Sequence, residues 1–313
     1  MIRLNKNRKW LTALGAALVL ALTPVFAQTA DQPSVHSKPS DAVDFSQPLT
    51  ISWRYESNFT LNLTPAFDSE RIYLPLAGGT VVSLMGGSGQ LNWRSEMGGE
   101  LSASPVADER AVYVASESGK PETGTRRATG ALRALGREGG VTQWMRTLAM
   151  PLRGGLTLGN GKLFGGSSDG KIYALDSANG EARWSYDYGA PFNSRPVVSE
   201  SRVYIGSEDG NLLALDEATG KLLWHFRTKG AIRGAVANGN DIVYFGSGDG
   251  YVYAVNATTG RLIWRKRTGA GVELLFEHQR PGSYNPPQVL LHRKGVFSSS
   301  TRRSLACDRS VSR

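Results

Sequence analysis

Tryptophan recurs at a nearly constant interval through most of this chain. After Trp10, the tryptophans are Trp53, Trp93, Trp144, Trp184, Trp224 and Trp264, at intervals of 40, 51, 40, 40 and 40 residues. A fixed interval of this size indicates repeated structural units, each of which buries its apolar surface against the next. The repeat therefore restricts the possible folds before any residue is given a role.

The sequence within each interval predicts four short antiparallel strands. The clearest copies, 168–184, 208–224 and 248–264, each contain Asp-Gly, an apolar run, a polar turn and a second apolar run that ends in tryptophan. Asp-Gly between two such runs predicts a hairpin. A second hairpin in each copy closes on a glycine, and these glycines are Gly180, Gly220 and Gly260. Four strands in about 40 residues form one β-propeller blade, so we predict an all-β propeller with five repeats within 49–271.

The N-terminal segment predicts export. Basic residues precede an apolar stretch that ends at Val25-Phe26-Ala27, which is typical of a signal peptide over 1–27. The alternative is a membrane anchor, but Pro24 and the short apolar run disfavour a stable span. Residues 28–48 are rich in Pro, Ser, Asp and Gln and are predicted to be a disordered leader. We therefore expect a periplasmic or secreted protein, with outer-membrane association as an option and no integral span after cleavage.

The charge distribution argues against nucleic-acid binding. The formal net charge is +9, but the basic excess lies in 1–27 and 272–313, and the part between is close to neutral. A near-neutral body lacks the basic face that phosphates require. Cys307 is the single cysteine, which excludes an internal disulfide.

Both ends of the repeat region leave the predicted ring incomplete. Residues 50–55, around Trp53, resemble the last strand of a blade that lacks its other three strands. The basic tail 272–313 has no Asp-Gly hairpin and no tryptophan. One interpretation is that the tail supplies three irregular strands and gives six blades; these strands would be 272–277, 288–292 and 295–299. The other, which we favour because the composition changes abruptly, is that a shifted reading frame replaced native sequence and truncated the ring.

The repeat resembles a known family. Asp-Gly, then Ala-Leu-Asp, then Gly220 and Trp224 at their spacing resemble the repeat of the pyrroloquinoline-quinone (PQQ)-like β-propellers. The resemblance covers about 54–264, and the first two units are degenerate. It implies that each tryptophan packs on the neighbouring blade near its turn glycine, so Trp53, Trp93, Trp144, Trp184, Trp224 and Trp264 are expected to be structural. One large aromatic at every interface between blades suits a ring of sheets.

Two classes of protein share this repeat. Quinoprotein dehydrogenases hold PQQ and calcium, and the resemblance to them would imply a pair of adjacent cysteines, whereas this chain has only Cys307. The recurrent Asp169, Asp209 and Asp249 are expected to form turns, and the four histidines lack metal-ligand spacing. We therefore predict a non-enzymatic scaffold without catalytic residues, metal or cofactor, similar to the BamB-type outer-membrane assembly propellers. The alternatives are a PQQ-dependent dehydrogenase-like protein and a propeller that senses a ligand.

One loop is the candidate partner site. The second repeat is 11 residues longer than the others, and the additional residues fall between Ser116 and Gly130. Loops carry binding residues more often than strands do. We predict that Lys120, Arg126 and Arg127 contact an acidic surface of a periplasmic or outer-membrane assembly protein. A solvated insertion without function is the alternative. Tethering to the membrane is not implied, because no cysteine lies near the predicted cleavage site after Ala27.

Overall fold

The structure, a computed structural model, describes residues 51–117 and 129–268, and the backbone of 272–274 and 291–293. The chain divides into two compact units, 1–50 and 51–313, and all described residues belong to the second unit. The predicted signal peptide, leader and charged insertion lie outside the described residues. None of the described elements is a helix long and apolar enough to span a membrane.

Five four-stranded antiparallel units, called sheets below, follow one another along the chain, which confirms the predicted fold class. A parallel pairing between Ser104 and Gly155 joins the first strands of the second and third units into one eight-stranded sheet. The first sheet contains β1 (Ala66–Phe67), β2 (Arg71–Leu76), β3 (Thr80–Met85) and β4 (Leu91–Glu96). The second contains β5 (Leu101–Ala107), β6 (Ala111–Glu117), β7 (Gly130–Gly136) and β8 (Thr142–Leu148). The third contains β9 (Leu152–Gly159), β10 (Lys162–Ser167), β11 (Lys171–Asp176) and β12 (Ala182–Asp187). The fourth contains β13 (Val197–Ser199), β14 (Arg202–Gly206), β15 (Asn211–Asp216) and β16 (Leu222–Arg227). The fifth contains β17 (Ala237–Gly239), β18 (Ile242–Gly246), β19 (Tyr251–Asn256) and β20 (Leu262–Arg267).

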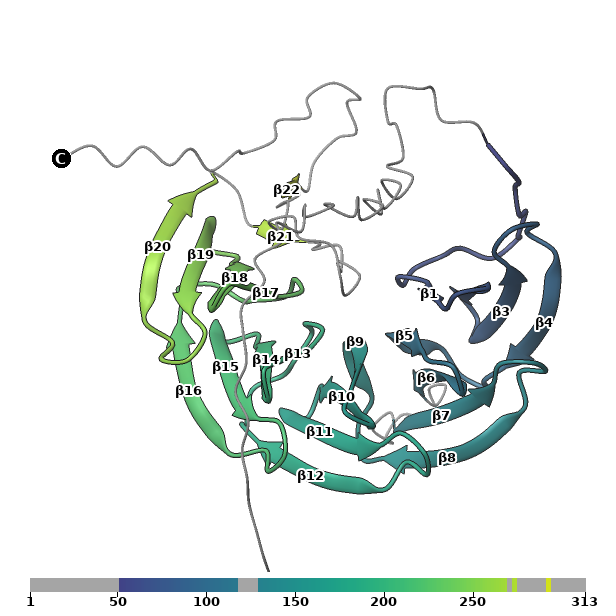
Figure 1. The fold of residues 1–313 in the computed structure, drawn as a ribbon, viewed down its shortest axis with the longest axis horizontal. Coiled ribbons are helices and arrows are strands. Elements are labelled where there is room, and N and C mark those ends of the chain that lie inside the picture. Colours follow the sequence, from purple (N-terminus) through teal and green to yellow (C-terminus); the bar gives the residue numbers. More distant parts are fainter. Residues whose placement is uncertain (1–50, 118–128, 269–271, 275–290, 294–313) are drawn as a thin grey trace, which may run out of the picture. The chain divides into compact units, whose positions relative to one another are not determined.

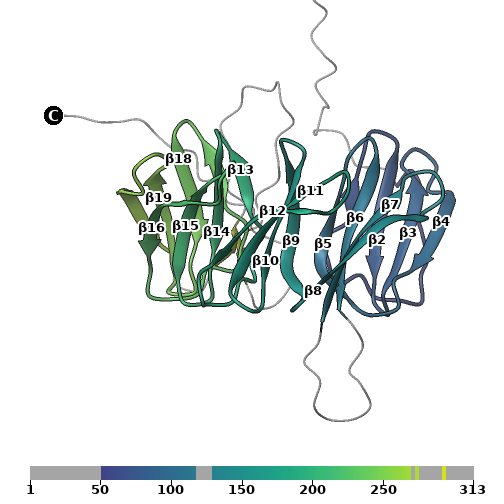
Figure 2. The ribbon, with the colours of Figure 1, turned by 90° about the horizontal axis from the view of Figure 1, so that it is seen from below.

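Within residues 51–268 the sheets are arranged like propeller blades. The first strand of each sheet lies innermost and the fourth strand lies on the outer rim (Figure 1). The strands run between two faces, which carry the loops (Figure 2). We call one of them the Asp-Gly face; it carries the hairpins between second and third strands and the links between sheets. The opposite face carries the turns between third and fourth strands.

The turn between the third and fourth strands explains why the Ala-Leu-Asp…Gly…Trp pattern recurs. The Asp216 Oδ1 atom accepts hydrogen bonds from the Thr219 amide, at 2.8 Å, and from its hydroxyl, at 2.6 Å. Gly220 then adopts a φ of 72°, which is the left-handed region that favours glycine. Ala214 pairs directly with Trp224 across the strands, and a small side chain there leaves room for the indole.

The core lies between adjacent sheets. The tryptophan of each sheet packs on an aromatic residue of the second strand of the same sheet, with ring centroids 5.8–6.0 Å apart. The pairs are Tyr73–Trp93, Tyr113–Trp144, Phe164–Trp184, Tyr204–Trp224 and Tyr244–Trp264. The first four second-strand aromatics are fully buried, whereas Tyr244 is half-buried. Each pair is therefore covered by the following sheet, except the last.

The two ends of the repeat differ from the sequence interpretation in detail. Residues 51–60 do not form a strand, because none of the described strands pairs with them in the way that the third strand of a sheet pairs with the fourth. After the fifth sheet, β21 (Val272–Leu274) pairs antiparallel with β22 (Leu291–Arg293). The rest of the tail lies outside the described residues. The number of blades, the closure of the ring and the origin of the tail therefore stay predictions.

Candidate functional site

Each sheet is joined to the next through the indole of its fourth strand. Four indole N–H groups donate to a backbone carbonyl of the following sheet: Trp93 to Arg137 at 2.6 Å, Trp144 to Ser177 at 3.1 Å, Trp184 to Glu217 at 3.0 Å and Trp224 to Ala257 at 3.0 Å. The glycine three residues after each acceptor lies against the indole, where a Cβ atom would come within 2.5–2.6 Å of the ring. These glycines are Gly140, Gly180, Gly220 and Gly260. The structure thus places these tryptophans and glycines together at the joints between sheets.

The aspartates of the Asp-Gly hairpins are occupied by structural hydrogen bonds. The Asp169 carboxylate accepts from the Lys171 amide at 3.0 Å and from the Tyr173 hydroxyl at 3.3 Å. The Asp249 carboxylate accepts from the Tyr253 hydroxyl at 2.6 Å and from the Lys229 amide at 3.1 Å. Burial alone would raise the pKa of Asp249, but these hydrogen bonds outweigh it and hold the pKa below its ordinary value.

Asp209 repeats this arrangement and extends it between sheets. Its carboxylate accepts from the Asn211 side-chain amide and from the Tyr188 hydroxyl, both at 3.0 Å. Tyr188 lies in the link that follows β12, so the bond connects the third sheet to the fourth. Among the described residues, no group of three or more His, Cys, Asp or Glu side chains could hold a metal ion.

Ion pairs brace the Asp-Gly face where sheets meet. Arg153 Nη2 lies 2.6 Å from the Glu117 carboxylate and connects the third sheet to the second. Arg233 connects the fifth sheet to the fourth through two contacts with the Glu208 carboxylate, at 2.7 and 2.9 Å. The Asn193 side-chain amide also donates to Glu208, at 2.7 Å. These contacts stabilise the face from which the insertion between β6 and β7 extends.

The insertion begins and ends at two paired strands, β6 and β7. Glu117 is the last residue of β6, and its amide donates to the carbonyl of Glu100 at 2.8 Å. Gly130 is the first residue of β7 and lies so close to Met150 and Pro151 that a Cβ atom would come within 2.6 Å of backbone. Lys120, Arg126 and Arg127 lie outside the described residues, so their predicted role stays a prediction.

A charged network at the joint between the first and second sheets was not anticipated from the sequence. Arg137 Nε donates to the Asp68 carboxylate at 2.8 Å, and its Nη1 lies 3.2 Å from the Glu109 carboxylate. Asp68 also accepts from the Tyr73 hydroxyl at 2.7 Å, and its side chain is only 2% exposed. A sequence signal existed, because Gly136-Arg137-Glu138 replaces the Asp-containing turn of the later repeats.

The electrostatics of this network follow from its burial and hydrogen bonds. Burial would raise the pKa of Asp68, but hydrogen bonds from Tyr73, backbone amides and Arg137 together lower it. Burial, with the neighbouring carboxylate, raises the pKa of Tyr73 to about 12. Arg71 adds a second bond across the joint, from Nη2 to Glu138 at 2.8 Å. The network therefore holds two sheets together with its charges already paired.

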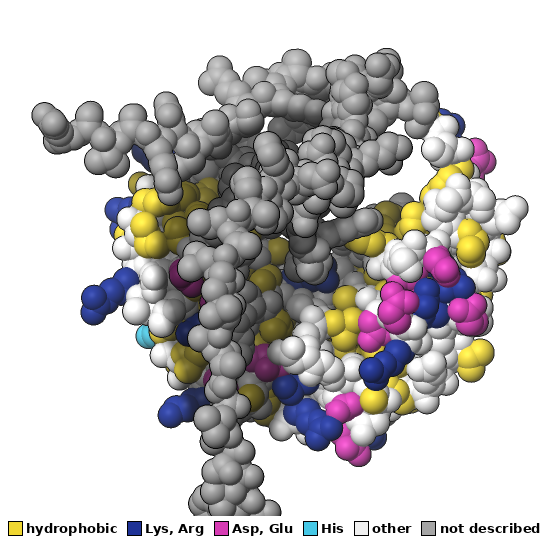
Figure 3. Space-filling view, in the orientation of Figure 1, with side chains coloured by type: hydrophobic (Ala, Val, Ile, Leu, Met, Phe, Trp, Pro, Cys, Tyr) yellow, Lys and Arg dark blue, Asp and Glu magenta, His cyan; other side chains and the backbone are white. Residues whose placement is uncertain are grey.

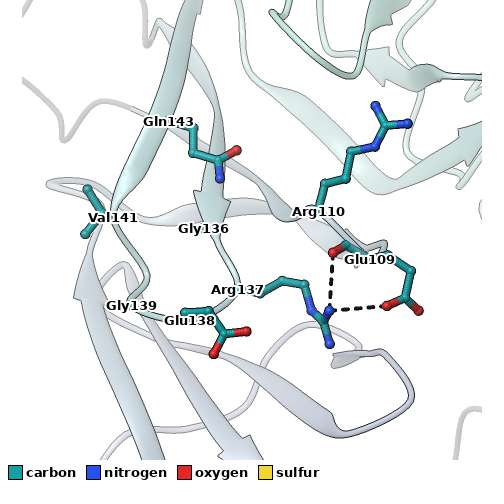
Figure 4. Close-up of a pocket in the computed structure, with 8 residues that line it drawn as sticks. All are labelled: Glu109, Arg110, Gly136, Arg137, Glu138, Gly139, Val141 and Gln143. Atoms are coloured by element: carbon teal, nitrogen blue, oxygen red, sulfur yellow. Dashed lines mark hydrogen bonds and ion pairs between the residues drawn. The ribbon is translucent and has the colours of Figure 1, made fainter.

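A shallow depression of about 310 Å³ lies beside this network (Figure 4). Its lining residues are Glu109, Arg110, Gly136, Arg137, Glu138, Gly139, Val141 and Gln143. The Arg137 guanidinium points toward Glu109 and is held by it, while the Arg110 side chain extends away from that pair (Figure 4). Acidic and basic side chains also intermix on the surface of this region (Figure 3). The depression offers paired charges, which suit a complementary polar surface better than a buried small molecule.

One family model matches the chain. The model described as "Outer membrane protein assembly factor BamB" matches residues 128–273, which span the third, fourth and fifth sheets and part of the second. A search of the curated proteins by sequence found no match.

Solved structures share the fold at low sequence identity. BamB from Moraxella catarrhalis is 21% identical, with a TM-score of 0.60 over 71% of this chain and 69% of that chain. Quinohemoprotein alcohol dehydrogenase from Comamonas testosteroni is 14% identical, with a TM-score of 0.55 over 67% of this chain and 43% of that chain. The ADHIIG quinohemoprotein alcohol dehydrogenase from Pseudomonas putida HK5 is 15% identical, with a TM-score of 0.55 over 69% and 43%. Residues 128–273 therefore match a family model of BamB-type PQQ-like β-propeller repeats, and the solved structures share the propeller fold.

Proposed function

We propose that this chain is an exported, non-enzymatic β-propeller scaffold that binds outer-membrane assembly proteins through its Asp-Gly face. The observation that carries the proposal is the hairpin of β6 and β7, whose paired ends Glu117 and Gly130 connect the inserted residues to that face. Glu117, at its base, is paired with Arg153 of the next sheet. A binding loop on a rigid base loses less conformational freedom when it meets a partner.

The sequence of the insertion supplies positive charge for such a partner. Lys120, Arg126 and Arg127 lie within it, next to a body that is close to neutral. The family description supports a partner from the outer-membrane assembly machinery. We therefore propose that these three side chains contact an acidic patch on an assembly protein in the periplasm, after removal of residues 1–27.

The hydrogen bonding of the repeated aspartates supports a scaffold over a catalyst. Asp169, Asp209 and Asp249 each use their carboxylate oxygens for turn amides and tyrosine hydroxyls. A general base or a metal ligand needs a free oxygen directed at its substrate or ion. The Asp169 carboxylate is used within its own sheet, and those of Asp209 and Asp249 also bond the link from the preceding sheet.

A charge-reversal experiment tests the proposal. Lys120→Glu, Arg126→Glu and Arg127→Glu are combined, and binding of the full chain to purified outer-membrane assembly proteins is measured by pull-down and titration. We expect binding to weaken at least about tenfold, as electrostatic contacts at an interface predict. The matched control is Lys221→Glu with Arg261→Glu, two exposed residues in turns of the opposite face. Equal binding by the wild type and the triple variant would contradict the proposal.

A further inference from the structure

Every joint between sheets consists of two halves that recur along the chain. The donor half is the tryptophan of the fourth strand, packed on the aromatic residue of the second strand. The acceptor half is the turn glycine of the next sheet with the carbonyl three residues before it. In the joint between the fourth and fifth sheets these groups are Trp224, Tyr204, Gly260 and Ala257.

The fifth sheet presents a donor half that faces no described acceptor half, although the short strand β21 contacts its second strand, β18. Trp264 is 42% exposed, whereas Trp93 in an internal joint is 7% exposed. Its indole N–H has no acceptor in the part of the chain that the structure describes. Tyr244, which packs on it with ring centroids 6.0 Å apart, is half-buried, whereas its four counterparts are fully buried. Trp264 therefore has the aromatic neighbour that is typical of a joint, but it is more exposed than a tryptophan inside one.

The first sheet presents an acceptor half that the chain itself fills. Trp53 donates its indole N–H to the Gly86 carbonyl at 2.8 Å, and a Cβ atom on Gly89 would come within 2.6 Å of the indole. Tyr55 packs on the same sheet. Trp53 thus occupies the place that the tryptophan of a preceding sheet occupies in the four internal joints.

Among the described tryptophans, Trp53 is the one whose segment forms no strand. Residues 222–227, around Trp224, form a ladder of hydrogen bonds with β15. Residues 51–55 pair with no strand in the described part of the chain, and Ile51 is 74% exposed. Trp53 is therefore retained by one hydrogen bond and by side-chain packing, so it can leave without breaking a sheet.

We propose that the fifth sheet of one copy docks on the first sheet of a second copy, where Trp264 replaces the Trp53 of that copy. The occupant is a second copy because the chain presents both halves of one recurring joint, and each half accepts the other in four internal examples. The new joint has the same indole–glycine contact and the same indole–carbonyl hydrogen bond as those examples. The inference concerns self-association and stands apart from the proposed scaffold function.

Because Trp53 is covalently connected to the first sheet, it competes with the Trp264 of a second copy and so determines how strongly two copies associate. A segment attached by a short linker competes at an effective concentration in the millimolar range, so Trp53 keeps the association of the wild type weak. Head-to-tail contacts of this kind extend into chains unless a ring closes. By occupying the acceptor half of the first sheet, residues 51–55 thus inhibit head-to-tail polymerisation of the chain.

Sedimentation velocity of the full chain over a range of concentrations tests the proposal. We expect Trp53→Ala to associate at least about tenfold more tightly than the wild type, because the competing indole of Trp53 is removed. Trp53→Ala combined with Trp264→Ala should weaken this association about 30-fold, as expected for loss of a central aromatic anchor. Trp53→Ala combined with Met145→Ala is the matched control and should associate like Trp53→Ala, since Met145 is 50% exposed on β8, away from both halves.

A peptide of residues 49–57 gives a second readout that does not depend on Trp264. Added in excess, it should refill the acceptor half and dissociate the Trp53→Ala assemblies, while the same peptide with alanine in place of tryptophan should not. The proposal is overturned if Trp53→Ala stays monomeric while folded, as judged by circular dichroism. It is equally overturned if its assemblies persist unchanged after Trp264→Ala.

Discussion

The indole nitrogen of Trp184 lies 3.0 Å from the backbone carbonyl oxygen of Glu217 in the following sheet. The side chain of the same Glu217 lies 2.7 Å from Lys162 Nζ, so the third sheet holds this residue both by backbone and by carboxylate. Glu217 is only 5% exposed. One turn of the fourth sheet is therefore fixed at two points, and repeated contacts of this kind determine how consecutive sheets pack.

A tryptophan at a joint between two sheets should contribute far more to the free energy of unfolding than Trp264, which faces no following sheet among the described residues. We expect Trp224→Ala to lower the free energy of unfolding by about 3–5 kcal/mol, because it empties a packed contact and removes a hydrogen bond. Trp264→Ala, its matched control, should cost about 1 kcal/mol, because Trp264 is already 42% exposed. Denaturant unfolding of both variants at low protein concentration measures the difference. Equal costs would show that the fifth sheet is covered.

The turn glycines should be intolerant of a methyl group for two separable reasons. Gly220 has a φ of 72° and lies so close to Trp184 that a Cβ atom would come within 2.5 Å of the ring. Gly161 has the same φ but open space around its Cβ position. We expect Gly161→Ala to cost about 1 kcal/mol from backbone strain alone, and Gly220→Ala to cost at least about 2 kcal/mol more from the clash. Thermal unfolding of both variants measures the separation, and similar melting temperatures would contradict close packing at the joint.

The joint between the first and second sheets should weaken in acid. The folded pKa of Asp68 lies below its ordinary value of 3.8, so its contribution to stability is present above that value and is lost as pH falls through the folded pKa. Asp68→Asn should cost about 2 kcal/mol at pH 7, because it leaves Arg137 without its buried partner, and should flatten the acid dependence. The measurement is the melting temperature from pH 7 to pH 2.

Asp108→Asn is the control for that experiment. Asp108 accepts from the Arg110 and Ala111 amides and from the Tyr113 hydroxyl, as Asp68 does from its own neighbours. It has no counterpart of Arg137 among its hydrogen-bond partners, so its substitution reports the turn alone. An identical acid dependence in both variants would show that the ion pair between sheets contributes nothing.

The PQQ-dependent alternative gives an opposite expectation for a cofactor titration. A scaffold whose repeated aspartates are engaged in turns should show no change in melting temperature or absorbance when PQQ and calcium are added. Specific binding would stabilise the folded state by mass action, by about 2.7 kcal/mol at a hundredfold excess over the dissociation constant. A saturable rise in melting temperature with calcium and PQQ together would favour the dehydrogenase class.

The sequence predicted the sheets because the residues that define each blade recur at fixed positions. Asp-Gly forms a hairpin, Ala-Leu-Asp forms a turn with a small residue facing the indole, and Trp packs against the next sheet. Each of these roles can be predicted from one repeat and checked in the others. The strand order of the third, fourth and fifth sheets follows from them directly.

The contacts between Asp68 and Arg137 could not be predicted in the same way. The two residues are separated by 69 positions and occupy places where the first two repeats depart from the common pattern. Only the arrangement of the sheets brings them together, and neither side chain signals its partner. The prediction of a strand at 50–55 was wrong for a related reason. Residues 51–55 do not form a strand, because no described strand pairs with them.

The most direct test of the account is a hydrogen-exchange footprint of the full chain with and without purified outer-membrane assembly proteins. We expect slower exchange in the hairpins of the Asp-Gly face, around 117–130, 168–170 and 208–210, and little change in the turns of the opposite face. Slower exchange confined to the opposite turns, around 176–181 and 216–221, or no change anywhere at saturating partner, would contradict a scaffold that binds through the interrupted hairpin.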